Sequence, residues 1–174
     1  MSKDKEKVVG KKNFILKIIF IILIIITCIV IFLFSSQNGE KSSGVSEGVL
    51  ESIINFLPNT RDLPADEKQV LIENSQFFIR KTAHFSVYTL LGIELMGLLS
   101  LYEISKRRKI LIALLCGALY AISDEIHQMF SPGRTAKIMD VFIDSCGVVF
   151  GIVIVNLVLM IVKRVKDSKV SKHI

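Results

Sequence analysis

The chain has 174 residues, of which 51% are apolar and 22% are charged, and its mean hydropathy is +0.55. This length fits one domain, but the hydropathy is too high for an ordinary soluble domain, and the apolar residues come in long blocks. The net charge of +6 would suggest nucleic acid as the partner of a soluble protein. Here the basic residues flank the apolar blocks, so we expect membrane lipids as partners and no nucleic acid.

Four segments are predicted to cross a membrane as α-helices, because a bilayer core about 30 Å thick needs roughly 20 apolar residues. We place these spans at about residues 14–34, 82–102, 107–127 and 138–162. The first block is longer than a signal-peptide core and lacks a good cleavage site, which indicates an uncleaved anchor. We therefore expect a membrane domain over 18–162 between a basic N-terminus, 1–17, and a basic tail, 163–174.

The distribution of Lys and Arg predicts the orientation of these spans. The N-terminus, the loop between the second and third spans, and the C-terminal tail together carry 15 of these residues, whereas the segments on the opposite side carry seven. Cytoplasmic segments are enriched in Lys and Arg, so this split predicts a multi-pass protein of the cell membrane with both termini in the cytoplasm. Segments 35–81 and 124–139 then face outward.

The outward segment between the first two spans is predicted to be amphipathic. Apolar residues recur at helical spacing from Val45 to Leu57, where Pro58 stops the run, and a second such stretch includes Val70 and Phe78. Both stretches fit the outer membrane–water interface, and both equally fit a helical loop packed on the bundle. The fold class we predict is an all-α integral membrane protein with four transmembrane helices and this amphipathic outer segment.

Two features inside the spans leave alternatives open. Gly147 and Gly151 have the G-x-x-x-G spacing that lets a neighbouring helix approach closely, although the spacing also occurs incidentally. Glu94 lies near the middle of the second span, where a lone carboxyl is protonated or hydrogen-bonded to another helix. Its role is as compatible with structure as with function.

Ionisable residues concentrate at the outer ends of three spans. The purely apolar part of the third span, residues 110–123, covers only about 21 Å of helix, so the helix has to continue through the polar residues that follow. Charged groups at that depth are costly and are usually paired or functional. We predict that one outer cluster contains Arg80, Lys81, His84, Tyr88, Asp124, Glu125, His127, Gln128, Arg134, Asp140 and Asp144.

The pattern of these residues resembles that of the VanZ-like family. The resemblance rests on Arg80-Lys81-x-x-His84-Phe85-x-x-Tyr88, on Tyr120-Ala-x-x-Asp124-Glu125-x-His127-Gln128-x-Phe130, on Pro132-Gly133-Arg134, on Asp140-x-x-x-Asp144-x-x-Gly147, and on Ser36-Gln37. It covers about residues 18–160. It implies a small four-span bacterial membrane protein of the cell envelope, in a family whose founding member is associated with resistance to teicoplanin-type glycopeptide antibiotics.

The first functional hypothesis is a site acting on a lipid or lipid-linked phosphate head group at the outer leaflet. A histidine, His84 or His127, would transfer protons, and an aspartate, Asp124 or Asp144, would orient it. The catalytic candidates are His84, Asp124, Glu125, His127, Asp140 and Asp144, and the candidates for binding the head group are Arg80, Lys81, Tyr88, Gln128 and Arg134.

A comparison with type 2 phosphatidic acid phosphatases both supports phosphate chemistry and limits it. Arg134-x5-Asp140-x3-Asp144 is similar to their R-x5-H-x3-D motif, but Asp140 occupies the position of the nucleophilic histidine. A phosphohistidine step at that position is therefore absent. An aspartyl nucleophile is chemically possible.

Other functional classes remain open on the sequence. The same groups would suit a non-catalytic protein that binds an envelope lipid, a lipid-linked cell-wall precursor or a lipidated glycopeptide, and a purely structural ion-pair cluster is a third reading. A transporter is disfavoured because the polar groups gather at one end of the spans. Metal binding by His84, His127 and the carboxylates ranks lower, although carboxylate plus imidazole suits Mn²⁺ or Zn²⁺. We expect no metal ion and no cofactor, because the chain has no C-x-x-C pair and no H-E-x-x-H signature.

Overall fold

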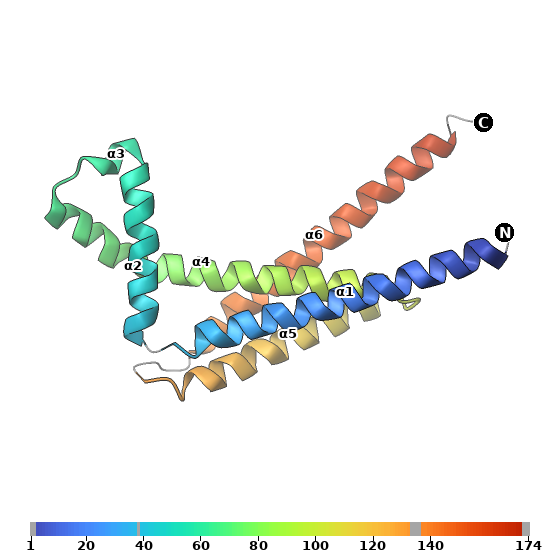
Figure 1. Cartoon of the computed structure of the whole chain (residues 1–174), viewed down its shortest axis with the longest axis horizontal. Helices are drawn as coiled ribbons and strands as arrows, with labels where there is room; N and C mark the ends of the chain where they lie inside the picture. The colour runs from blue at the N-terminus through green and yellow to red at the C-terminus, as the bar shows by residue number, and fades with distance from the viewer. Residues whose placement is uncertain (1–2, 38, 133–136, 172–174) are drawn as a thin grey trace.

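In a computed structural model of the chain, residues 3–37, 39–132 and 137–171 are described, and the regular elements in these ranges are all α-helices (Figure 1). The six helices are α1 (Lys3–Ser35), α2 (Gly39–Phe56), α3 (Pro58–Arg61), α4 (Ala65–Ser100), α5 (Lys106–Gln128) and α6 (Ile138–Ser171). Four of them, α1, α4, α5 and α6, are long and apolar enough to cross a membrane. The all-α fold with four spans that the sequence predicts is confirmed.

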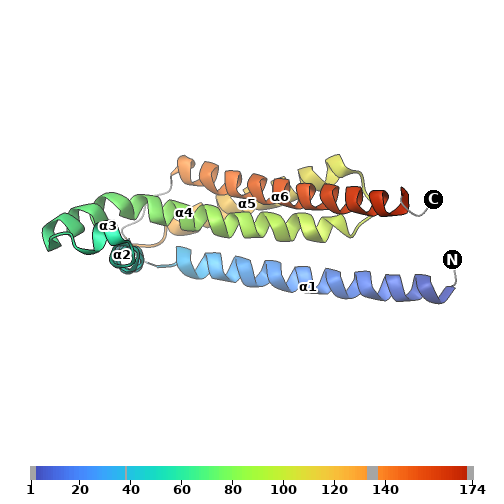
Figure 2. The ribbon, with the colours of Figure 1, turned by 90° about the horizontal axis from the view of Figure 1, so that it is seen from above.

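The four long helices run roughly alongside one another, and both described ends of the chain lie at the same end of the bundle (Figures 1 and 2). The opposite end, which we call the distal end, carries α2, α3 and the connection between α5 and α6. Both α4 and α6 start at the distal end, so these two helices are parallel. The surface fits a bilayer, because large apolar side chains such as Ile22, Ile25 and Ile29 of α1 are about half exposed.

The packing of α4 against α6 depends on glycines. A Cβ atom placed on Gly147 would lie 2.6 Å from the carbonyl oxygen of Phe85, and one on Gly151 would lie 2.7 Å from the backbone nitrogen of Ile93. Both contacts are with the backbone of α4, which cannot move aside as a side chain does. The G-x-x-x-G spacing is therefore used here for close helix approach rather than being incidental.

Helix α2 crosses the long helices at a steep angle at the distal end (Figure 1). Its buried residues Leu50 and Ile54 pack against Ile72 of α4 and form a small second core. Val49 and Ile53 remain exposed on the same helix. The crossing direction and the exposed apolar residues fit a helix that lies in a membrane–water interface while one face packs on α4.

The second amphipathic stretch of the sequence is not a separate element. It is the first half of α4, which continues without interruption from Ala65 into the predicted second span and ends at Ser100. The segment has no proline and its first glycine is Gly92, so nothing in its sequence breaks the helix before the span. Pro64 directly precedes the helix, where its missing N–H is not needed.

The buried carboxyl of Glu94 joins α4 to α1. The Thr27 hydroxyl donates a hydrogen bond of 3.0 Å to Glu94 Oε1, and both residues are buried. This contact lies well away from the distal end, so it is separate from the polar residues gathered there. It supports the structural reading of Glu94, as a carboxyl hydrogen-bonded to a neighbouring helix.

We predict that Gly151→Ala destabilises the fold, whereas Gly48→Ala does not. The new methyl group at 151 meets the α4 backbone, and such overpacking costs about 1–3 kcal/mol. At Gly48 no atom lies within 4 Å of the place that a Cβ would take, and alanine is the better helix former by up to about 1 kcal/mol. Thermal unfolding in detergent, followed by circular dichroism, measures both. Equal midpoints for the two variants would contradict this account of the packing.

Candidate functional site

Two polar pairs join α4 to α6 at the distal end. Lys81 Nζ lies 2.5 Å from Asp140 Oδ2, and the two side chains are 16% and 17% exposed. One turn further along both helices, His84 Nδ1 lies 3.7 Å from Asp144 Oδ1, with Asp144 only 2% exposed. Because α4 and α6 are parallel, the same register that places the glycines against α4 brings these pairs together.

Helix α5 adds Asp124 and Gln128 to the same region. Gln128 Nε2 donates hydrogen bonds to Asp124 Oδ2, at 3.0 Å, and to Ser35 Oγ of α1, at 3.3 Å. Ser131 also donates to the Ser35 carbonyl oxygen, at 3.3 Å. Asp124, Gln128 and Ser35 are all buried, so the end of α1 closes the polar region on one side.

The ligand atoms of His84, Asp124 and Asp144 come together within 4.8 Å of one another. Tyr88 is fully buried, and its hydroxyl lies near Asp124 and Asp144. Within the described residues, that hydroxyl has no hydrogen-bond partner. We use the name distal cluster for seven side chains in this region; they are Lys81, His84, Tyr88, Asp124, Gln128, Asp140 and Asp144.

Glu125 has a different position from its neighbour Asp124. Its Oε1 accepts a hydrogen bond of 2.6 Å from the backbone N–H of Lys137, just before α6 begins. An acidic side chain is favourable at a helix N-terminus, where backbone N–H groups lack partners. Glu125 therefore fixes the start of α6, and with it the first turn that carries Asp140.

His127 lies outside the distal cluster. Its ring stacks on Phe32 of α1, with 4.5 Å between ring centroids, and its Nε2 is 3.0 Å from Ser36 Oγ. Successive helix residues are rotated by about 100°, so a residue three positions after Asp124 is offset by about 60° around α5. That offset is enough to turn His127 toward α1 while Asp124 faces α4 and α6. Arg134, also predicted for the site, falls outside the described residues.

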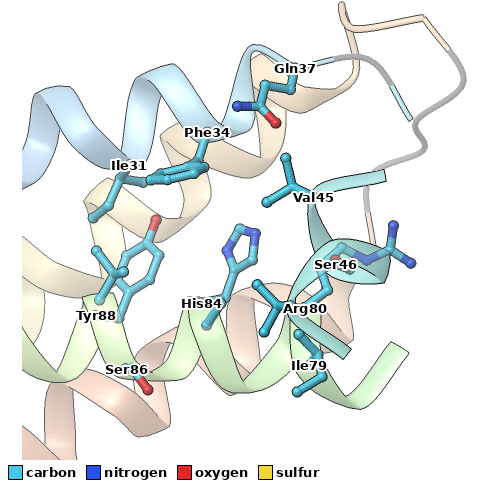
Figure 3. Close-up of a pocket in the computed structure, with 13 residues that line it drawn as sticks. Ile31, Phe34, Gln37, Val45, Ser46, Ile79, Arg80, His84, Ser86 and Tyr88 are labelled. Atoms are coloured by element: carbon cyan, nitrogen blue, oxygen red, sulfur yellow. The ribbon is translucent and has the colours of Figure 1, made fainter. Parts of the chain in front are cut away.

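A pocket of about 340 Å³ adjoins the distal cluster between α1, α2 and α4 (Figure 3). Much of its lining is apolar and includes Ile31, Phe34, Val45, Val49, Ile79 and Val87. Its polar lining includes Arg80, His84 and Tyr88 of α4. The His84 ring points into the space between α1 and α2 in the close-up (Figure 3). His84 and Tyr88 therefore belong both to the pocket and to the distal cluster.

The contribution of α1 to the site is larger than the sequence indicated. Ser35 is fully buried and accepts from Gln128, and Ile31 and Phe34 form one wall of the pocket. A signal for Ser35 exists in the sequence, because it is the first polar residue after the long apolar block and so lies at the same depth as the cluster. The apolar wall residues carry no such signal, since they look like any other lipid-facing residues.

This arrangement has defined chemical capabilities. Arg80 supplies positive charge in the pocket lining, and Lys81, paired with Asp140, supplies it in the adjoining cluster; both suit an anionic group. His84 lies 3.7 Å from the buried carboxyl of Asp144, and imidazole is the side chain best suited to proton transfer near neutral pH. His84, Asp124 and Asp144 also form the nitrogen and oxygen donor set that divalent transition-metal ions accept.

The comparisons with known proteins agree with the residue pattern. The family model described as VanZ/LLP1 matches residues 20–160, which include most of all four spans and the whole distal cluster. No curated protein and no solved structure matches the chain. On the strength of this match over most of its length, the chain is a multi-pass membrane protein that belongs to the VanZ/LLP1 family.

Proposed function

We propose that this protein works in the cell envelope, where it binds a lipid or lipid-linked phosphate head group at the outer leaflet of the cell membrane. We further propose that this activity contributes to resistance against teicoplanin-type glycopeptides. The observation that carries the proposal is the sharing of His84 and Tyr88 between a largely apolar pocket and a buried charged cluster. Such a site suits a molecule that is apolar over most of its length and charged at one end.

The distribution of charge supports the proposed placement at the outer leaflet. The described ends of the chain, the basic 106–109 segment and the basic part of α6 lie at one end of the bundle, and the distal cluster lies at the other. With the 15:7 distribution of Lys and Arg, cytoplasmic termini put the distal cluster outside. Helix α2 would then lie at the outer interface, beside the pocket that it helps to line.

Each part of the site has a role in this proposal. Arg80 and Lys81 attract the phosphate, and the apolar lining of the pocket accepts the first part of an acyl or prenyl chain. His84, which lies beside Asp144, is the general acid or base of any chemical step. His127 is assigned no such role, because its contacts are with Phe32 and Ser36 of α1.

A binding protein without turnover is the second candidate, favoured by the apolar character of the pocket. Both candidates need the same head-group contacts, so loss of binding in Lys81→Ala does not separate them. Product formation from a purified phospholipid or prenyl phosphate separates the two candidates. An acid–base enzyme forms product as wild type and loses turnover, but not binding, in His84→Gln. A binding protein forms no product even as wild type.

The resistance assay compares His84→Ala and His127→Ala in a susceptible Gram-positive host. At matched membrane levels, we expect wild type and His127→Ala to raise survival on teicoplanin, and His84→Ala and Asp124→Asn to lose that protection. Vancomycin, which lacks the lipid tail, serves as the comparison drug. Protection retained by His84→Ala and Asp124→Asn would show that the distal cluster is structural, and a lack of protection from the wild type and every variant would remove resistance as the function.

Orientation is tested by cysteine labelling in intact cells. With Cys28, Cys116 and Cys146 replaced by serine, Lys137→Cys is expected to react with a membrane-impermeant maleimide without lysis. Lys106→Cys, in the exposed loop end at the opposite side, is expected to react only after lysis. The reverse pattern would place the distal cluster in the cytoplasm and contradict the proposal.

Filling the pocket is expected to abolish lipid binding without touching the charged residues. Ala83→Phe adds a bulky ring to the pocket lining, whereas Thr82→Phe adds the same ring at the neighbouring exposed position outside that lining. We expect at least a tenfold (about 1.4 kcal/mol) loss of affinity for a vesicle-borne phospholipid only in Ala83→Phe. Native mass spectrometry of the purified protein measures retained lipid. Equal retention in both variants would exclude this pocket as the lipid site.

A further inference from the structure

We propose that His84, Asp124 and Asp144 bind one divalent transition-metal ion at the distal cluster. Each of the three helices α4, α5 and α6 contributes one of these residues, and one ligand atom from each lies within 4.8 Å of the other two. The proposal goes beyond the function proposed above. It rests on that function only where it assigns the ion a role toward the head group, and in the metal-bound site His84 is a ligand rather than a general acid or base.

The distances suit a shared ion better than direct pairing. His84 Nδ1 and Asp144 Oδ1 are 3.7 Å apart, which is longer than a hydrogen bond between nitrogen and oxygen. Two ligands held at about 2.1 Å from one Zn²⁺ ion at tetrahedral angles lie about 3.4 Å apart. Small side-chain rotations are therefore enough to bring all three ligand atoms onto one ion.

The two buried carboxylates of the cluster favour binding of a cation. Asp124 and Asp144 are 5% and 2% exposed, so both carboxylates are withdrawn from water at close range. The nearest lysine, Lys81, is already paired with Asp140. His84 supplies at most one positive charge, whereas a divalent ion compensates both aspartates.

The surroundings of the triad resemble the outer shell of a metal site. Gln128 donates to Asp124 Oδ2 at 3.0 Å, in the way that outer-shell groups hold ligating carboxylates. The Tyr88 hydroxyl is buried next to both aspartates and has no hydrogen-bond partner within the described part of the chain. A metal-bound water, or the ion itself, would give that hydroxyl a partner.

The triad also leaves room for a further ligand. Three protein ligands plus an open position are the usual arrangement of ions that act on substrates rather than stabilise folds. His84 and Tyr88 line the pocket, so the open position would face the space proposed for the lipid. An oxygen of the phosphate head group is the ligand we assign to it, with Lys81 and Arg80 alongside.

The test measures Zn²⁺ bound to the full-length protein in detergent, after stripping with EDTA. Equilibrium dialysis with elemental analysis is expected to give one ion per wild-type chain. We expect Asp144→Asn and His84→Gln to bind at least about tenfold more weakly. Two matched controls, Asp66→Asn on the exposed start of α4 and His127→Gln, are expected to bind as wild type does.

A second measurement keeps the test decisive if a variant fails to fold. X-ray absorption of the Zn²⁺-loaded wild type is expected to show only nitrogen and oxygen ligands, with one imidazole among them. Binding of less than one ion per wild-type chain, equal binding in Asp144→Asn and Asp66→Asn, or an absorption spectrum without imidazole would each overturn the proposal. Lipid retention measured in EDTA is a separate readout. If the wild type retains lipid in EDTA and Lys81→Ala does not, the proposed head-group binding stands even when the metal site is overturned.

Discussion

The close approach of α4 and α6 is the constraint on which the rest of the structure depends. Gly147 and Gly151 let the two backbones touch, and the helices are parallel, so residues spaced by three or four positions meet in register along their whole contact. Following that register toward the distal end leads to His84 with Asp144 and then to Lys81 with Asp140. The polar pairs are thus the continuation of a packing contact that glycine makes possible.

The same contact explains how a membrane protein can keep several carboxylates buried. An unpaired charge in an apolar environment costs several kcal/mol, so such groups persist only where partners are held in place. Here the partners are Lys81 of α4 for Asp140 of α6, Gln128 one turn further along α5 for Asp124, and the backbone N–H of Lys137, just before α6, for Glu125. Loosening one helix would leave charges on the others without compensation, which ties the integrity of the site to the packing of the bundle.

The sequence predicted the fold well because each span is a long apolar block with polar ends. Such a block can be recognised along the chain without any knowledge of tertiary contacts. It also predicted that His84, Asp124 and Asp144 occur at a common depth. The direction in which each side chain points around its helix was harder to predict. Residues three positions apart are expected to share a helix face, yet His127 points toward α1 while Asp124 points toward His84 and Asp144. The close approach of His84, Asp124 and Asp144 was not visible either, since these residues are 40 and 20 positions apart and belong to three helices.

Helix α4 is one uninterrupted rod of 36 residues, about 54 Å long. About three quarters of the way along it is held against α6 at Gly92, and its first half carries the small core shared with α2. If α4 pivots as one body at Gly92, Ala65 lies about 40 Å from the pivot and His84 about 12 Å. A sideways movement of the α2 end then reaches His84 reduced about threefold. With α2 at the membrane–water boundary, as proposed, a movement of that boundary would then change the spacing between the His84 imidazole and the two aspartates.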